Sequence, residues 1–204
     1  MKILTCLSLV LLLSACTPLL PAPEPVAPET GHVLEPTRLP DARVAAPGAP
    51  RIAVLAVRPG PRLDGSAMLY RDASGRHAAF AANRWVAPPE AQLGDLLVAA
   101  LERAGGVSAV IAPGGRGQAG LLLEAELLHL ELDAAGEPGT LHLELRLQLL
   151  AGPGREVLAT TRLEEREPLA APGPAAMAAA AGRALDRLLE ASAGFVREAI
   201  AARG

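Results

Sequence analysis

Lysine and cysteine are nearly missing from this sequence, and each shortage excludes a kind of chemistry. Lys2 is the only lysine, so the rest of the chain cannot form a Schiff base with a substrate or cofactor. Cys6 and Cys16 are the only cysteines, and both lie close to the start. The remainder of the chain can therefore form no internal disulfide and offers no thiolate to a metal ion.

The sequence also has no excess of positively charged residues and few aromatic residues. The 19 Lys and Arg residues are outnumbered by 22 Asp and Glu residues, so the net charge is −3 and no basic patch stands out. Nucleic acid is therefore not an expected partner. Aromatic residues make up only 2% of the chain, yet Tyr70, Phe80 and Trp85 fall within one short region. That region must either pack in the core or present a surface.

The apolar run at the start of the chain is too short to span a bilayer as a helix. It covers residues 3–13, follows the basic Lys2 and leads directly into the letters LSAC, which end at Cys16. This order is typical of a lipoprotein signal peptide, and a buried helix that merely ends in cysteine is the alternative. We favour a signal peptide over residues 1–15 and lipidation of Cys16.

The lipid anchor determines the expected compartment. Acyl chains such as palmitate contribute about 0.8 kcal/mol per buried methylene, so a multiply acylated cysteine holds a protein on a membrane. Thr17 follows Cys16 at the position where an Asp would indicate retention in the inner membrane of a Gram-negative cell. By this sorting convention we expect the outer membrane, with the protein facing the periplasm.

Proline dominates the next part of the chain. Residues 16–50 are rich in proline and show no sustained hydrophobic period, which predicts an extended tether with at most a short strand near His32. At about 3.1 Å per residue such a tether could reach roughly 100 Å. Residues 51–204 are then expected to form a single α/β domain.

The patterns within that domain predict a mixed, largely antiparallel sheet with two main helices packed on it. The helix that begins at Pro88-Pro89 ends at Gly105-Gly106, and the closing helix begins at Pro174. A strand, helix and strand in succession favour parallel pairing of the strands on either side of the first helix. The expected strands lie at residues 51–57, 66–72, 76–85, 107–111, 123–133, 140–150 and 155–165.

The letters LHLEL occur twice between residues 128 and 145, and each copy places a His two residues before a Glu. In the second strand leucine alternates strictly with polar residues, whereas the first strand changes phase near Leu127-Leu128, which predicts a β-bulge. If Asp133 and Thr140 close the turn, two pairs of side chains face each other on the outer side of the sheet. These pairs are Glu131 with His142, and His129 with Glu144.

These four outward side chains raise the question of a metal site. Two imidazoles and two carboxylates suit zinc or non-haem iron, so one hypothesis is a metal-dependent envelope enzyme that uses His129, Glu131, His142 and Glu144. The alternative is the solvated side of a hairpin, or a surface between subunits. A flat sheet face by itself provides neither a pocket nor supporting groups, so we favour the alternative and expect no metal and no cofactor.

The other motifs do not indicate catalysis. The serines lack the spacing of a nucleophile elbow. The Gly-rich residues 112–120 lack the Lys-Ser/Thr ending of a phosphate-binding loop and do not open onto a helix. We therefore do not expect an enzyme.

The segments NRWVAPPEAQL, at residues 83–93, and LATTRLEEREP, at residues 158–168, carry a family likeness. Together with the lipobox they resemble the ABC-type transport auxiliary lipoprotein family, the PqiC-like lipoproteins of MCE-domain lipid transport systems. The likeness covers about residues 51–202. Its further elements are Leu63-Asp64, Tyr70-Arg71, Arg84-Trp85 and Pro88-Pro89.

The resemblance implies a fold similar to the amino-terminal domain of TolB and a role without catalysis. It implies that an MCE-domain protein and ABC transporter components are the partners, that the membrane is reached through the lipid anchor, and that lipids pass between membranes at the outer membrane. It leaves room for a homo-oligomer and for a structural role in envelope assembly. Tyr70, Arg71, Arg84 and Trp85 are the predicted partner-binding residues, with Trp85 as a core residue under the first helix as the alternative.

Overall fold

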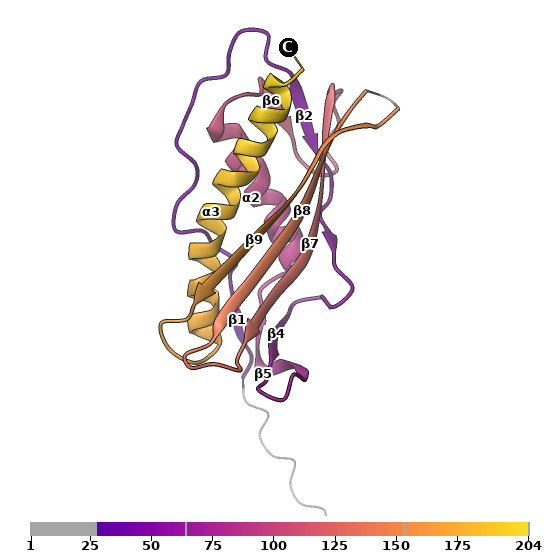
Figure 1. The fold of residues 1–204 in the computed structure, drawn as a ribbon. Coiled ribbons are helices and arrows are strands. Elements are labelled where there is room, and N and C mark those ends of the chain that lie inside the picture. The colour runs from indigo at the N-terminus through magenta and orange to yellow at the C-terminus, as the bar shows by residue number, and fades with distance from the viewer. Residues whose placement is uncertain (1–27, 64, 153, 204) are drawn as a thin grey trace, which may run out of the picture.

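The sheet is organised around strand β7, which spans Leu121–Asp133. The computed structural model describes residues 28–63, 65–152 and 154–203, and within them nine strands form one sheet. Two helices cover one face of this sheet, so the predicted mixed α/β fold is confirmed (Figure 1). The predicted signal peptide and the predicted lipidation at Cys16 lie outside the described residues.

Strand β7 is paired along both of its edges. On one edge it runs antiparallel to β8, Thr140–Ala151, which in turn pairs with β9, Glu156–Pro168. On the other edge three short strands run parallel to it one after another. These are β2, Arg51–Val54, β3, Arg58–Pro59, and β4, Ala67–Arg71.

Three further strands complete the sheet. Strand β6, Ala109–Ile111, lies parallel to β2 at the edge of the sheet. It does not pair with β5, the strand directly before the first helix, so the predicted parallel pairing of the two strands that flank this helix is wrong. Strand β5, His77–Trp85, forms the predicted hairpin with β4, and β1, Thr30–His32, lies parallel to β5.

The predicted bulge in β7 is present. Leu127 pairs with Leu145 and His129 pairs with Glu144, so Leu128 is the extra residue. Gly60 passes close to this point, and its N–H donates to the Leu127 carbonyl at 2.7 Å. A Cβ at Gly60 would lie 2.8 and 2.9 Å from the carbonyl oxygens of Leu127 and Leu128, so only glycine allows this approach.

Helices α2, Pro89–Ala104, and α3, Pro174–Ala201, bury the leucine face of the sheet. Each begins with a proline, whose missing N–H costs nothing at a helix start. The alternating leucines of β8 are fully buried beneath the helices, and the polar residues between them form the opposite face. Among the residues that the structure describes, no helix combines enough length with enough hydropathy to cross a membrane.

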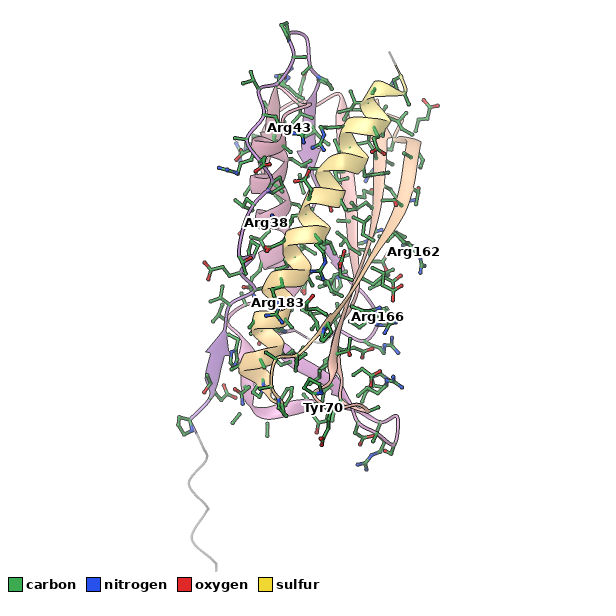
Figure 2. The ribbon with its side chains drawn as sticks, turned by 60° about the vertical axis from the view of Figure 1, so that its left-hand side comes forward. Arg38, Arg43, Tyr70, Arg162, Arg166 and Arg183 are labelled. Carbon is green, nitrogen blue, oxygen red and sulfur yellow. The ribbon has the colours of Figure 1, made fainter. Side chains whose placement is uncertain are left out.

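The sequence prediction placed the boundary between tether and domain at residue 51, but residues before it already pack on the domain. We call residues 30–43 the N-terminal strap: after β1 they run beside α2 and α3, where Arg38 and Arg43 are labelled (Figure 2). Leu34 is 3% exposed, and the backbone N–H of Thr37 donates to Asp186 of α3 at 2.8 Å. Proline content indicated an extended chain correctly, but it did not show that this chain packs on the helices.

Gly182 of α3 allows the N-terminal strap to lie against the helix. A Cβ at this position would lie 2.6 Å from the carbonyl oxygen of Glu35. We expect Gly182→Ala to lower the free energy of unfolding by about 1–3 kcal/mol, since displacing the strap outweighs the roughly 1 kcal/mol that alanine gains in helix propensity. Denaturant unfolding measures this change, and limited proteolysis should cut the strap faster.

Gly194 of the same helix provides the control. A Cβ there would meet nothing nearer than the Arg197 guanidinium, at 3.8 Å. Gly194→Ala should therefore raise the stability by up to about 1 kcal/mol. Equal effects of the two substitutions would contradict the role of Gly182.

Glu167 of β9 joins the sheet to α3 through two arginines. Arg183 Nε donates to it at 2.6 Å and Arg187 Nη2 at 2.8 Å. Burial by itself would raise the pKa of Glu167, but these hydrogen bonds outweigh burial and hold the pKa below its ordinary value of 4.5. The stabilisation is therefore present above the ordinary pKa and is lost as the pH falls through the lowered folded-state pKa.

We expect Glu167→Gln to lower the free energy of unfolding by about 1 kcal/mol at neutral pH. The difference from the unchanged protein should shrink as the pH is lowered through the folded-state pKa of Glu167, because Glu167 itself then becomes protonated. Denaturant unfolding over this range tests the sign. Glu190→Gln is the matched control, because Glu190 is half exposed and its partner Arg197 lies 3.6 Å away. If the difference in unfolding free energy between Glu167→Gln and the unchanged protein grew as the pH fell, the proposed ion pairs of Glu167 with Arg183 and Arg187 would be contradicted.

Candidate functional site

Three of the four histidines of the chain gather around one buried carboxylate on the open face of the sheet. The carboxylate is Glu131 of β7, which is 8% exposed. We call His77, His129 and His142 the histidine cluster; they come from β5, β7 and β8. The site therefore depends on three strands that are far apart in sequence.

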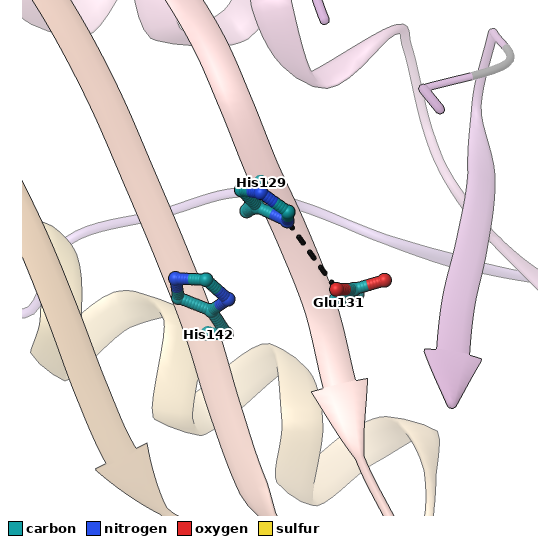
Figure 3. Close-up of side chains that lie close together, drawn as sticks. All are labelled: His129, Glu131 and His142. Carbon is teal, nitrogen blue, oxygen red and sulfur yellow. Dashed lines mark hydrogen bonds and ion pairs between the residues drawn. The ribbon is translucent and has the colours of Figure 1, made fainter. Parts of the chain in front are cut away.

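The ring of His129 and the carboxylate of Glu131 lie side by side on β7 (Figure 3). Their Nδ1 and Oε1 atoms are 3.3 Å apart, and His77 Nδ1 lies 3.0 Å from the other oxygen, Oε2. The rings of His129 and His142 stack at a centroid distance of 4.5 Å with 18° between their planes.

His142 points its second nitrogen toward the neighbouring strand. Nε2 lies 3.2 Å from Glu164 Oε1 of β9 and 4.0 Å from Glu144 Oε2. This buried atom has no aligned hydrogen-bond partner among the residues that the structure describes. Burial, and next the charge of His129, lower the pKa of His142 below its ordinary value.

A cleft of about 380 Å³ opens beside the histidine cluster. Arg166 lies on the side of β9 that faces away from α3 (Figure 2). Arg71 contacts Asp133 at 2.5 Å, and a hydrogen bond from the Ala135 N–H is the main cause that lowers the pKa of Asp133. The cleft is thus polar and carries charges of both signs. Its lining residues are Arg62, Arg71, Gly75, His77, Glu131, Asp133, His142 and Arg166.

The four residues of the predicted hairpin site are not equivalent. The predicted cross-strand pairs, Glu131 with His142 and His129 with Glu144, are confirmed. One potential ligand atom each from His129, Glu131 and His142 lies within 4.8 Å of the others, a spacing that could hold a metal ion. Glu144 is not part of this group, and Arg162 donates to it at 3.0 Å.

The predicted partner-binding residues separate into one core residue and three at the surface. Trp85 is 1% exposed, so it packs in the core and cannot anchor a partner from this position; the alternative interpretation of Trp85 is the correct one. Tyr70 is half-buried and lies 4.9 Å from the ring of Phe80. Arg84 is half-exposed and contacts Glu29 at 2.5 Å. Partner binding by Tyr70, Arg71 and Arg84 stays a prediction.

Sequence reasoning missed His77, Arg62 and Arg166 as members of this region. His77 reaches Glu131 because β4 lies between β5 and β7 in the sheet. Arg62 reaches His129 from the loop after β3, with Nη2 2.8 Å from Nδ1. No local pattern marks these residues, because their neighbours are decided by strand order.

Comparison with known proteins identifies the family. The family model for the ABC-type transport auxiliary lipoprotein component matches residues 32–193. The chain belongs to this family. The predicted resemblance is thereby confirmed, and the match begins within the N-terminal strap, in agreement with the earlier start of the folded unit. Family membership gives this auxiliary lipoprotein an envelope-associated location and partners in a transport system.

Solved structures share the fold of this auxiliary lipoprotein. A DUF330-family protein from Xanthomonas campestris has a TM-score of 0.70 and 23% identity, with coverage of 85% of this chain and 98% of the other. A hypothetical protein from Chlamydia trachomatis has a TM-score of 0.55 and 10% identity, with coverage of 76% and 99%. These identities show the fold alone. No protein with a curated description matches the auxiliary lipoprotein.

The buried position of Trp85 can be tested directly, because it is the only tryptophan. Its fluorescence should be that of an apolar environment, resist quenching by acrylamide and shift to the red on unfolding. Trp85→Ala should lower the free energy of unfolding by about 3–5 kcal/mol. Val86→Ala is the control: the side chain is 57% exposed, and its loss should cost less than about 0.5 kcal/mol. Ready quenching of the native protein would contradict burial.

Proposed function

We propose that this auxiliary lipoprotein is a non-catalytic component of an MCE-type lipid transport system, anchored through Cys16 in the outer membrane and facing the periplasm. The family match over residues 32–193 is the observation that carries the proposal. The sequence LSAC before Thr17 supports the anchor and its location. In this role the protein would dock the transport machinery at the membrane that receives or supplies the lipid.

The position of β1 supports a short connection between anchor and domain. The described chain begins at residue 28 and enters the sheet at Thr30, beside β5. Even a fully extended chain from Cys16 to residue 28 reaches only about 40 Å. The folded domain would therefore stay much closer to the membrane than the 100 Å tether of the sequence prediction.

The same end of the sheet carries the surface that we propose for docking. Tyr70 and Arg71 lie on β4 and Arg84 lies on β5, next to β1 (Figure 1). Arg71 and Arg84 keep 41% and 51% of their side-chain surface exposed even while they contact acidic neighbours. Arginine beside an aromatic ring is common at the centres of protein interfaces. A partner approaching the membrane end of the domain would meet these side chains first.

Co-purification tests this proposal. The full chain, extracted in detergent, should retain the MCE-domain protein of its own host. The double substitution Arg71→Ala and Arg84→Ala should reduce the retained partner about tenfold or more, while folding persists because exposed ion pairs contribute at most about 1 kcal/mol each. Arg155→Ala is the matched control, because Arg155 pairs with Glu124 at the opposite end of the sheet.

The anchor is tested separately from the docking surface. The Cys16→Ala protein should no longer be found in the outer-membrane fraction. In detergent extracts it should still retain the MCE-domain protein. Failure of the unchanged protein to retain any MCE-domain protein would contradict the transport proposal. Deletion of the gene provides a further test. A deletion strain with defective envelope assembly but normally distributed lipids would favour a structural role instead.

A further inference from the structure

We propose that His129, His142 and Glu131 form a zinc site on the open face of the sheet. This inference goes beyond the transport role and does not depend on it. It also revises the expectation that a flat sheet face provides no supporting groups. The structure places additional side chains around the three ligands, and each of them has a role that metal sites commonly require.

The spacing of the ligands fits a small tetrahedral ion. Two donors that are each about 2.0–2.1 Å from zinc in tetrahedral geometry lie about 3.3 Å from each other. His129 Nδ1 and Glu131 Oε1 are 3.3 Å apart. The third ligand lies within the same group, in which the candidate atoms are all within 4.8 Å of one another. A modest movement of the His142 ring therefore completes the set. Two imidazoles and one carboxylate are a common zinc ligand set.

His142 presents one nitrogen to the site and the other to a carboxylate. His142 Nε2 lies 3.2 Å from Glu164 on β9, on the side of β8 away from β7, so Nδ1 is left to face Glu131 (Figure 3). His129 Nε2 lies 3.7 Å from Glu144 Oε2 and 3.1 Å from Arg62 Nη2. Metal-binding histidines typically donate their second N–H to such an acceptor, which fixes the orientation of the ring.

The carboxylate ligand is oriented as well. His77 Nδ1 lies 3.0 Å from Glu131 Oε2, which leaves Oε1 on the side of His129. Glu131 is 8% exposed, and a buried carboxylate without a cation nearby is costly. The cluster therefore combines three ligands with supporting contacts to His142 and Glu131.

A guanidinium group lies against the His129 ring, beside the two atoms that would bind zinc. Arg62 Nη2 is 2.8 Å from His129 Nδ1, 3.1 Å from His129 Nε2 and 3.8 Å from Glu131 Oε1. The Arg62 side chain is 49% exposed, so it can move out into solvent. The positive charge of Arg62 therefore opposes a second cation beside His129 and Glu131. The fourth coordination position would face the cleft that Glu131 and His142 line, where water could enter.

Calorimetric titration of the full chain with zinc tests the site. The protein should be purified in detergent with a tag that contains no histidine, and it should be stripped of metal with a chelator. We expect one zinc ion per chain at micromolar affinity or better. His142→Gln and Glu131→Gln should each weaken binding by about 100-fold or more, and Glu164→Gln by about 10-fold to 100-fold. Cobalt in place of zinc should give the visible absorption of a four-coordinate site.

Arg62→Gln is the decisive variant, because it should tighten zinc binding by about tenfold when the competing cation is removed. His32→Gln is the matched control: His32 is the one histidine outside the cluster and contacts Asn83 at 2.9 Å. The fluorescence of Trp85 verifies that each variant is folded. Absence of saturable binding, or weaker binding by Arg62→Gln, would overturn the proposal. So would equal losses in His32→Gln and His142→Gln.

Discussion

The pairing of β7 along both edges is the constraint on which the rest of the structure depends. One edge is covered over its full length by β8, whereas the other is shared by β2, β3 and β4 in turn. Each short strand brings its own neighbours into the sheet. The bulge at Leu128 allows β7 to keep its leucines under the helices on both sides of the phase change. The passage of Gly60 against that bulge then determines where the loop carrying Arg62 lies.

The two faces of the sheet have different physical roles. The leucines of β7 and β8 supply the apolar surface that α2 and α3 cover, and this burial is the main favourable term in folding. The opposite face is not held by packing, so polar side chains can gather there without disturbing the core. His129, His142 and Glu131 alternate with buried leucines on β7 and β8, and the same pleat that buries the leucines therefore turns these three outward. The site is a consequence of the strand register.

The N-terminal strap is packed along both helices. Asp186 accepts hydrogen bonds from Thr37 and Arg38, and Arg43 and Arg103 bond through their backbones at 2.8 Å. A proline-rich segment has little conformational entropy to lose, so it can pack on a helix surface with few hydrogen bonds. The region that looked like a spacer is thus part of the structure that fixes where the chain leaves the domain.

The sequence by itself determined the features that depend on neighbouring residues. The alternation of leucine with polar residues predicted the bulge and the pairing of Glu131 with His142, because a register slip of one residue would expose the leucines. Pro88-Pro89 and Gly105-Gly106 predicted the ends of α2, because proline suits the first turn of a helix and glycine suits the position just after its end. Only the tertiary structure decided that Trp85 is buried and that His77 and Arg62 join Glu131. Those contacts follow from which strand lies beside which, and strand order depends on burying the whole apolar surface at once rather than on any local pattern.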